Sequence, residues 1–326
     1  MLENMGYTEG IRVALETCLG VKKGEEVLIV GDTDNLEIAA SFAEVTASLG
    51  VEVSLIIMKP REMHGIEPSK SVAAAMLGAD VILMPTSKSL THTDAREAAN
   101  KRGARIASMP AITREILRGP MKADYQRIRE ISERLADILT KASKASLTTD
   151  LGTNIELEIT GRKAIADTGI LIQPGAIGNL PAGEVFCAPI EDKGDGVLVF
   201  NVSMGGVGRL HEQIQVEVRE GKVISIKGGS EAKDFESILE QGDANAFNIA
   251  ELGIGTNPEA IKPIGNLLVD EKLMGTVHIA FGDNSHFGGL QKSNIHIDGV
   301  ISKPTLKLDG EVIIDAGKVK WGGEFL

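Results

Sequence analysis

Apolar residues in the first 145 positions form short continuous runs, and stretches with helical spacing lie between them. Val27 to Val30 is the first run, of the kind shown by a strand buried on both faces. A turn at Gly31 to Asn35 follows, and then a helical stretch from Leu36 to Leu49. Further expected elements are strands at Val51–Met58, Asp80–Pro85 and Arg105–Pro110, and a helix at Asp94–Lys101 with Thr93 as its N-cap. This alternation predicts a parallel sheet with helices on both faces.

The turn after the first predicted strand does not have the glycine pattern of a nucleotide-binding loop. It contains one glycine, Gly31, in place of GxGxxG, and no GxxxxGK[ST] occurs in the chain. Asp32 and Asp34 would repel a pyrophosphate placed at this turn. We therefore expect a Rossmann-like scaffold that binds no dinucleotide.

The apolar period changes in the second half of the chain. Ala123 to Ala145 has helical spacing and is the expected connecting helix, whereas Asn154 to Thr160 alternates with period two. Two expected hairpins follow, Gln213–Val218 with Lys222–Lys227, and Leu306–Leu308 with Glu311–Ile313 around Asp309-Gly310. The prediction is an α/β protein: a Rossmann-like parallel-sheet domain over residues 1–145, followed by a β-rich α+β domain over residues 146–326 that carries a metal site.

Composition excludes several classes of protein. The 326 residues include 34 Lys and Arg against 46 Asp and Glu, a net charge of −12, with 8 Phe, 2 Tyr and 1 Trp. An acidic chain with few aromatic residues is poorly suited to bind nucleic acid, which requires phosphate neutralisation and base stacking.

Cysteine usage and the N-terminus predict a cytoplasmic protein. Cys18 and Cys187 form no CxxC pair, which argues against a disulfide scaffold and a thiolate zinc site. Met1 to Asn4 lacks a basic segment before an apolar one, so no secretory signal is expected. Apolar runs such as Val53 to Met58 are far shorter than the ~20 residues of a membrane helix, so no membrane association is expected.

Two short strands of the second domain carry candidate metal ligands. In Asn294 to Asp298, period-two alternation places His296 and Asp298 on one face and isoleucines on the other. In Thr276 to Phe281, His278 lies opposite an apolar face. Burying an imidazole and a carboxylate together without a partner is unfavourable, so a bound ion explains this pair as well as a packing role does.

Two glutamates lie in similarly unusual surroundings. Glu184 follows a turn and precedes a strand, and Glu251 interrupts an apolar, glycine-punctuated run. With the two histidines and Asp298 they supply three carboxylates and two imidazoles, a set that suits Zn²⁺, Mn²⁺, Co²⁺ or Fe²⁺ in one or two positions. Asp270-Glu271-Lys272, by contrast, is expected to form a solvated turn before the His278 strand.

Four segments in order resemble the aminopeptidase T / aminopeptidase S family of metallopeptidases. They are Asn179–Ile190, Glu251–Asn257, Asp270–Gly282 and Ile295–Asp298. The resemblance implies a dimeric metallo-aminopeptidase that acts on small peptides with two metal ions, held by Glu184, Glu251, His278, His296 and Asp298. In that reaction Glu184 or Glu251 would accept the proton of the attacking water, and His286 would donate a hydrogen bond to the oxyanion.

Two departures keep a second function open. The chain is shorter than typical family peptidases, and Asp283 to His286 replaces an expected tyrosine. This shorter form also resembles 2,5-dihydroxypyridine 5,6-dioxygenase, a branch that uses one ferrous ion; His278, His296 and Asp298 would then form a two-histidine, one-carboxylate triad. A metal-binding protein without catalysis is the third hypothesis.

Overall fold

The computed structural model describes residues 6–321 and 324–325, and the chain folds into two compact units. One unit comprises Met1–Gln126 with Gly169–Ala182, and the other Arg127–Thr168 with Gly183–Leu326. The chain therefore passes between the units three times, which differs from the single boundary after residue 145 expected from the sequence.

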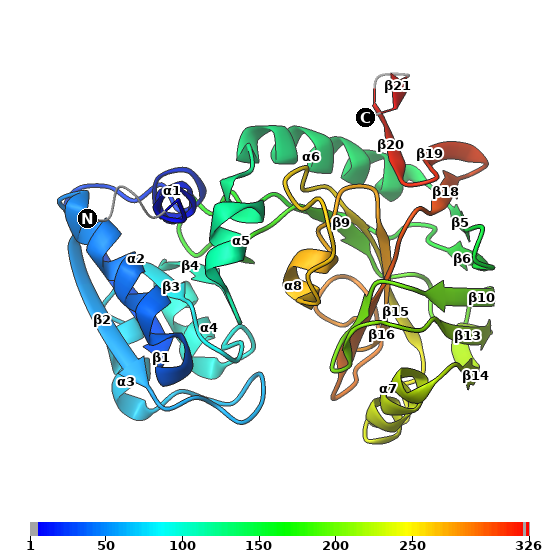
Figure 1. Cartoon of the computed structure of the whole chain (residues 1–326), viewed down its shortest axis with the longest axis horizontal. Coiled ribbons are helices and arrows are strands. Elements are labelled where there is room, and N and C mark those ends of the chain that lie inside the picture. Colours follow the sequence, from blue (N-terminus) through cyan, green and yellow to red (C-terminus); the bar gives the residue numbers. More distant parts are fainter. Residues whose placement is uncertain (1–5, 322–323, 326) are drawn as a thin grey trace. The chain divides into compact units, whose positions relative to one another are not determined.

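The first unit is built on a five-stranded parallel sheet of order β2-β1-β3-β4-β8 (Figure 1). Its strands are β1 (Glu26–Asp32), β2 (Glu52–Met58), β3 (Val81–Met84), β4 (Arg105–Ser108) and β8 (Ile177–Asn179). Its helices are α1 (Thr8–Arg12), α2 (Leu36–Ser48), α3 (Lys70–Met76), α4 (Asp94–Lys101) and α5 (Arg114–Arg118). The predicted α/β class and the four predicted parallel strands are confirmed, whereas β8 has only three residues and showed no sequence pattern.

Alternation along β1 explains how both faces of this sheet are covered. Leu28 and Val30 pack in one cluster with Val72 and Met76 of α3, while Val27 and Ile29 point to the other face and are equally buried. Helix α4 begins where the sequence predicted, because the hydroxyl of Thr93 accepts a hydrogen bond from the Arg96 backbone amide at 3.3 Å.

The second unit consists of two antiparallel sheets with a shared core. The nine-stranded sheet has the order β14-β13-β10-β6-β5-β18-β19-β20-β21, and the seven-stranded sheet β12-β11-β17-β16-β15-β9-β7. Core residues come from both sheets, from α6 and from α7; examples are Leu198, Val216, Leu252 and Ile279. The two sheets therefore pack face to face. The outer face of each sheet points away from this core.

The elements of this unit have the following bounds: α6 (Tyr125–Lys141), α7 (Ser230–Glu240), α8 (Leu267–Asp270), β5 (Lys144–Thr148), β6 (Asn154–Glu158), β7 (Ile165–Asp167), β9 (Glu184–Cys187), β10 (Asp195–Phe200), β11 (Ser203–Met204), β12 (Gly208–Arg209), β13 (Ile214–Arg219), β14 (Lys222–Lys227), β15 (Ile249–Gly255), β16 (Val277–Gly282), β17 (His296–Ile301), β18 (Thr305–Leu308), β19 (Glu311–Asp315), β20 (Lys318–Trp321) and β21 (Glu324–Phe325). Both predicted hairpins are confirmed as β13–β14 and β18–β19. The connecting helix ends at Lys141, earlier than predicted, since β5 begins at Lys144.

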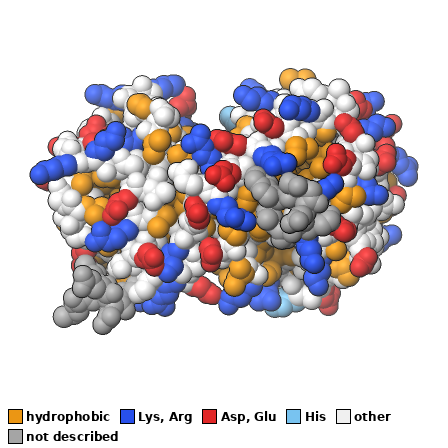
Figure 2. Space-filling model, turned by 90° about the horizontal axis from the view of Figure 1, so that it is seen from above, with side chains coloured by type: hydrophobic (Ala, Val, Ile, Leu, Met, Phe, Trp, Pro, Cys, Tyr) orange, Lys and Arg blue, Asp and Glu red, His pale blue; other side chains and the backbone are white. Residues whose placement is uncertain are grey.

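The surface carries charges of both signs. On the face of the molecule seen in Figure 2, basic and acidic side chains are interspersed over each unit. None of the helices in the described part of the chain is long and apolar enough to cross a membrane.

One ion pair in the first unit gives a test of its stability. Arg105 donates to both oxygens of Glu25, at 2.9 and 2.8 Å, and these hydrogen bonds hold the pKa of Glu25 below its ordinary value of 4.5. We expect Glu25→Gln to lower the free energy of unfolding by about 1–3 kcal/mol at neutral pH. Because only the charged carboxylate stabilises the fold, the difference from wild type should shrink as the pH falls below 4.5.

Urea unfolding of both proteins at neutral pH and at several pH values below 4.5 measures this effect. Glu16→Gln is the matched control, because Glu16 is 52% exposed beside Arg12 and its loss should change stability by less than about 0.5 kcal/mol. A Glu25→Gln deficit that is the same at every pH would contradict the ion-pair explanation.

Candidate metal centre

Four neighbouring strands of the seven-stranded sheet bring the five predicted ligands together. Glu184 lies on β9, Glu251 on β15, His278 on β16, and His296 and Asp298 on β17, and the sheet order places these strands side by side. Leu252 and Ile254 point into the core between the two sheets. By alternation, the polar side chains occupy the opposite face of the same strands.

Strand β15 is shaped to accommodate this face. Its pairing with β16 shifts register between Ile249 and Glu251. Gly253 lies directly opposite His278, and a Cβ atom on Gly253 would come within 1.9 Å of the imidazole Nε2. The glycine therefore provides the space that the buried imidazole occupies.

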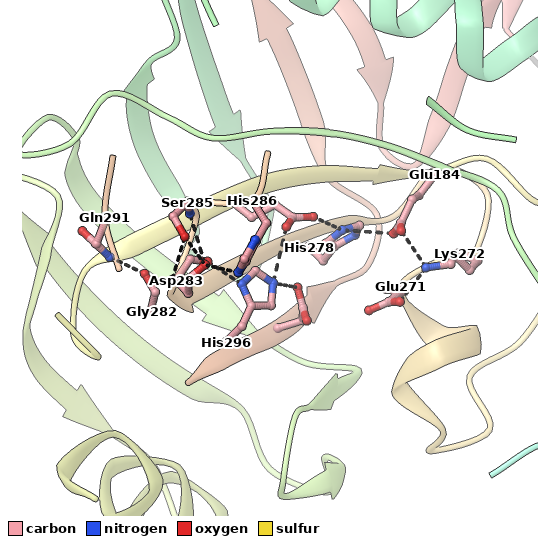
Figure 3. Close-up of polar contacts among 12 residues, drawn as sticks. Glu184, Glu271, Lys272, His278, Gly282, Asp283, Ser285, His286, Gln291 and His296 are labelled. Atoms are coloured by element: carbon pink, nitrogen blue, oxygen red, sulfur yellow. Dashed lines mark hydrogen bonds and ion pairs between the residues drawn. The ribbon is translucent and has the colours of Figure 1, made fainter. Parts of the chain in front are cut away.

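The side chains form one continuous line of contacts (Figure 3). Nε2 of His278 lies 3.4 Å from Oε2 of Glu184 and 3.2 Å from Oε1 of Glu251. Nε2 of His296 lies 3.4 Å from Oε2 of Glu251 and 3.5 Å from Oδ1 of Asp298. Carboxylates and imidazoles thus alternate from Glu184 to Asp298.

Three of the five residues form the most compact donor set. Glu251, His296 and Asp298 each offer a ligand atom, and these atoms lie within 4.8 Å of one another. Nδ1 of His296 donates to the backbone carbonyl of Asp283 at 2.7 Å, so Nε2 is the nitrogen directed at the carboxylates. Metal-bound histidines are commonly oriented by such a bond on their other nitrogen.

His278 is held differently. Its Nε2 faces two carboxylates, but its buried Nδ1 has no hydrogen-bond partner in the described part of the chain. Oε2 of Glu184 is buried and likewise accepts no hydrogen bond there. His278 therefore lacks the bond on its second nitrogen that orients His296.

Opposite charges dominate the electrostatics of the site. Burial alone would lower the pKa of His278, but the hydrogen bond with Glu251 and the nearby carboxylates raise it to about 9. Burial would raise the pKa of Asp298, but His296 outweighs it and lowers the pKa to about 2. A metal ion binding here must therefore displace protons from the imidazoles.

Sequence reasoning was wrong about the segment before β16. Lys272 was expected in a solvated turn, yet its side chain is completely buried. Its ammonium contacts Oε1 of Glu184 at 2.7 Å and Oε1 of Glu271 at 2.5 Å. In the sequence, the only indication that Lys272 is buried was its position in the same segment as His278.

His286 lies at the surface beside Asp283, whose carbonyl accepts the hydrogen bond of His296. Its side chain is 78% exposed, and its Nε2 is 4.0 Å from Oδ1 of Asp283. Phe287, the next residue, makes edge-to-face contacts with the His296 ring at 5.8 Å and with Phe186 at 5.4 Å. Sequence reasoning missed this aromatic cluster, because Phe186 and Phe287 are far apart in the chain.

The chain is thus a two-domain α/β protein with a candidate metal centre. One unit holds a parallel sheet, and the other holds two sheets with carboxylates and imidazoles on one outer face. The chain belongs to the 2,5-dihydroxypyridine 5,6-dioxygenase (NicX) family, whose model matches residues 7–321. It is therefore a member of an enzyme family.

The individual relatives include both kinds of enzyme that the sequence resembles, a dioxygenase and an aminopeptidase. The chain is 24% identical to 2,5-dihydroxypyridine 5,6-dioxygenase of Pseudomonas putida over 245 residues, which cover 71% of this chain and 68% of that protein. It is 23% identical to aminopeptidase AmpS of Bacillus subtilis over 180 residues, covering 49% of this chain and 43% of that protein. The resemblance inferred from the sequence motifs is confirmed.

Solved structures share the fold over nearly the whole chain. The Pseudomonas putida KT2440 dioxygenase matches with a TM-score of 0.78 at 20% identity, covering 96% of each chain. AmpT of Thermus thermophilus matches with a TM-score of 0.72 at 16% identity, covering 97% of this chain and 99% of that one. At these sequence identities the structural similarity establishes the fold alone. The reaction has to be inferred from the residues of the site.

Proposed function

We propose that this chain is a metal-dependent dioxygenase that opens a dihydroxylated, pyridine-like ring. The observation that carries the proposal is the compact donor set of Glu251, His296 and Asp298, whose ligand atoms lie within 4.8 Å of one another. Membership of the dioxygenase family and the activity of the Pseudomonas putida relative support the same reaction.

The donor set fits a divalent ion. Two carboxylates and one imidazole suit Fe²⁺, Mn²⁺ or Zn²⁺, and His278 lies close enough to Glu251 to join them. Glu251, His296 and Asp298 would hold a ferrous ion, which would supply one-electron chemistry toward O₂ when bound.

The surrounding residues have roles that follow from their contacts. The Asp283 carbonyl keeps Nε2 of His296 directed at Glu251 and Asp298. Phe287 packs edge-to-face with the His296 ring and with Phe186, and such aromatic surfaces favour a flat ring as substrate.

The direct test is oxygen consumption by the purified protein loaded anaerobically with Fe²⁺. With 2,5-dihydroxypyridine we expect oxygen uptake equal to ring loss, with no added reductant, and none after EDTA treatment. Asp298→Asn should abolish the uptake, whereas Asp315→Asn, the same change at an exposed position on β19, should not. Absence of oxygen uptake across a panel of dihydroxylated rings would refute the proposal.

Aminopeptidase activity is the second candidate, and one observation favours it. Glu184 and His278 continue the donor line beyond Glu251, giving the five-residue set that a two-metal peptidase would use. One glutamate would then act as base, and His286 as the oxyanion donor. Metal-dependent release of N-terminal residues from peptides under strict anaerobiosis, in the same preparation, would establish this reaction instead.

A further inference from the structure

A loop outside the donor line contacts His296 at two points. Residues 283–291, which follow β16, form this loop, called here the 283–291 loop. The carbonyl of Asp283 accepts the hydrogen bond from Nδ1 of His296 at 2.7 Å (Figure 3). The ring of Phe287, from the same loop, packs edge-to-face on the His296 ring with the centroids 5.8 Å apart. The orientation of His296 therefore depends on a segment separate from its own strand.

Asn284, which has no exposed surface, closes the 283–291 loop. Its side-chain oxygen accepts a hydrogen bond from the Gln291 amide at 2.8 Å, and its own amide donates to the Gln291 carbonyl at 3.0 Å. Its carbonyl accepts from the amides of Phe287 at 3.3 Å and Gly289 at 3.0 Å. The position of Phe287 is thus tied to the place where Asn284 is held.

Two charged side chains hold the 283–291 loop from outside. Oε1 of Glu191, beyond the end of β9, accepts hydrogen bonds from Nδ2 of Asn284 at 3.1 Å and from the Leu290 amide at 2.8 Å. Its Oε2 pairs with the guanidinium of Arg162, which also donates to the Gly288 carbonyl. The side chains of Arg162 and Glu191 are only 10% and 20% exposed, so solvent ions screen this pair little.

Glu191 is charged at neutral pH. Burial would raise its pKa, but the hydrogen bonds from Leu290 and Asn284 and the charge of Arg162 lower the pKa below its ordinary value of 4.5. Hydrogen bonds to an ionised acceptor are roughly twice as strong as those between neutral groups. Glu191 therefore attaches the loop to the rest of the unit through charge-assisted bonds.

We propose that Glu191 is a positioning residue for His296. It holds the 283–291 loop in place, and the loop in turn keeps the Phe287 ring against the imidazole and the Asp283 carbonyl on Nδ1. The inference rests on the proposed function in one respect, the use of His296 as a metal ligand. It gives Glu191, a residue outside the donor line, a part in how tightly the ion is bound.

Fluorine NMR of the metal-free, full-length protein tests the position of Phe287 directly. The phenylalanines are replaced biosynthetically by para-fluorophenylalanine, and the Phe287 signal is assigned by its absence from Phe287→Leu. Glu191→Ala should move this signal toward that of the free amino acid and increase its isotope shift in deuterium oxide, because the ring leaves its packed position. Asp192→Asn, which removes a neighbouring exposed charge, should leave the signal unchanged.

Mn²⁺ affinity, measured by equilibrium dialysis, tests the consequence for the ion. Loss of a group that orients a metal-bound histidine typically lowers affinity 10–100-fold, so we expect about 10-fold weaker binding in Glu191→Ala and wild-type binding in Asp192→Asn. Affinity is expressed per folded chain, with the folded fraction taken from circular dichroism. A role in overall stability alone would lower Tm and leave both the affinity and the Phe287 signal unchanged.

Gly289→Ala makes the test independent of how well Glu191→Ala folds. A Cβ atom on Gly289 would lie 2.0 Å from Oδ1 of Asn284, so the added methyl should displace Asn284 from Glu191. This variant should reproduce both the fluorine shift and the loss of affinity. An unchanged Phe287 signal in the folded variants, or a displaced Phe287 signal with wild-type Mn²⁺ affinity, would overturn the inference.

Neither readout requires turnover, so the inference and the proposed reaction can fail separately. Absence of oxygen uptake in wild type, together with the expected fluorine and affinity changes, would remove the dioxygenase proposal and leave the role of Glu191 standing. Ring opening by wild type, with Phe287 unmoved in both variants, would do the reverse.

Discussion

Glu251→Gln is expected to abolish metal binding and turnover while leaving the fold intact. Both oxygens of Glu251 are used, at 3.2 Å from His278 and 3.4 Å from His296, so the amide removes the charge and turns a donor group toward an imidazole. Since loss of even an outer-shell partner typically lowers metal affinity or activity 10–100-fold, loss of this residue should exceed about 100-fold. Titration with Fe²⁺ or Mn²⁺ and turnover assays measure the two effects.

The matched control is Glu236→Gln on the exposed side of α7, which should bind metal as wild type does. Circular dichroism and thermal unfolding of both variants establish that the fold is retained. Wild-type metal affinity in Glu251→Gln would remove this residue from the site.

Gly253→Ala is expected to damage the site through packing alone. The new methyl group would lie 1.9 Å from Nε2, 2.2 Å from Cε1 and 2.5 Å from Cδ2 of His278, and the imidazole is 1% exposed and has no free space to enter. Overpacking of this kind typically destabilises by about 1–3 kcal/mol. We expect that loss in urea unfolding, together with a lower metal affinity as His278 is forced against Glu184 and Glu251.

Gly78→Ala is a control for the same change, because the nearest atom to its added methyl would be the Ala75 carbonyl oxygen at 3.6 Å. It should leave metal affinity unchanged. Wild-type stability and metal affinity in Gly253→Ala would show that the His278 ring does not need the space beside β15.

The parts of the fold that the sequence revealed are those governed by local patterns. Four parallel strands, the Thr93 cap and two hairpins follow from apolar runs, a hydroxyl before a helix, and turn residues. Strand β8 escaped prediction, because three residues carry no periodicity and its partner β4 is about 70 residues earlier in the chain.

The site, too, contains some residues that local sequence patterns reveal and others that they do not. His296 and Asp298 could be paired from alternation alone, and Glu251 was conspicuous as a charge among apolar residues and glycines. Lys272 could not be predicted, since it stands next to two acidic residues in a segment that reads as a solvated turn. Its burial depends on Glu184, 88 residues away, and contacts at that separation are set by the order of strands in the sheet.

The return of residues 169–182 to the first unit has a consequence for biosynthesis. On the ribosome, the N-terminal sheet can acquire its fifth strand only after the chain has been made past Asn179, when much of the second unit has yet to be synthesised. Until then β4 is an edge with unpaired backbone groups, open to pairing with another nascent chain. A fragment cut after residue 145 would keep that edge permanently, so expression of the N-terminal half alone should favour aggregation over a soluble domain.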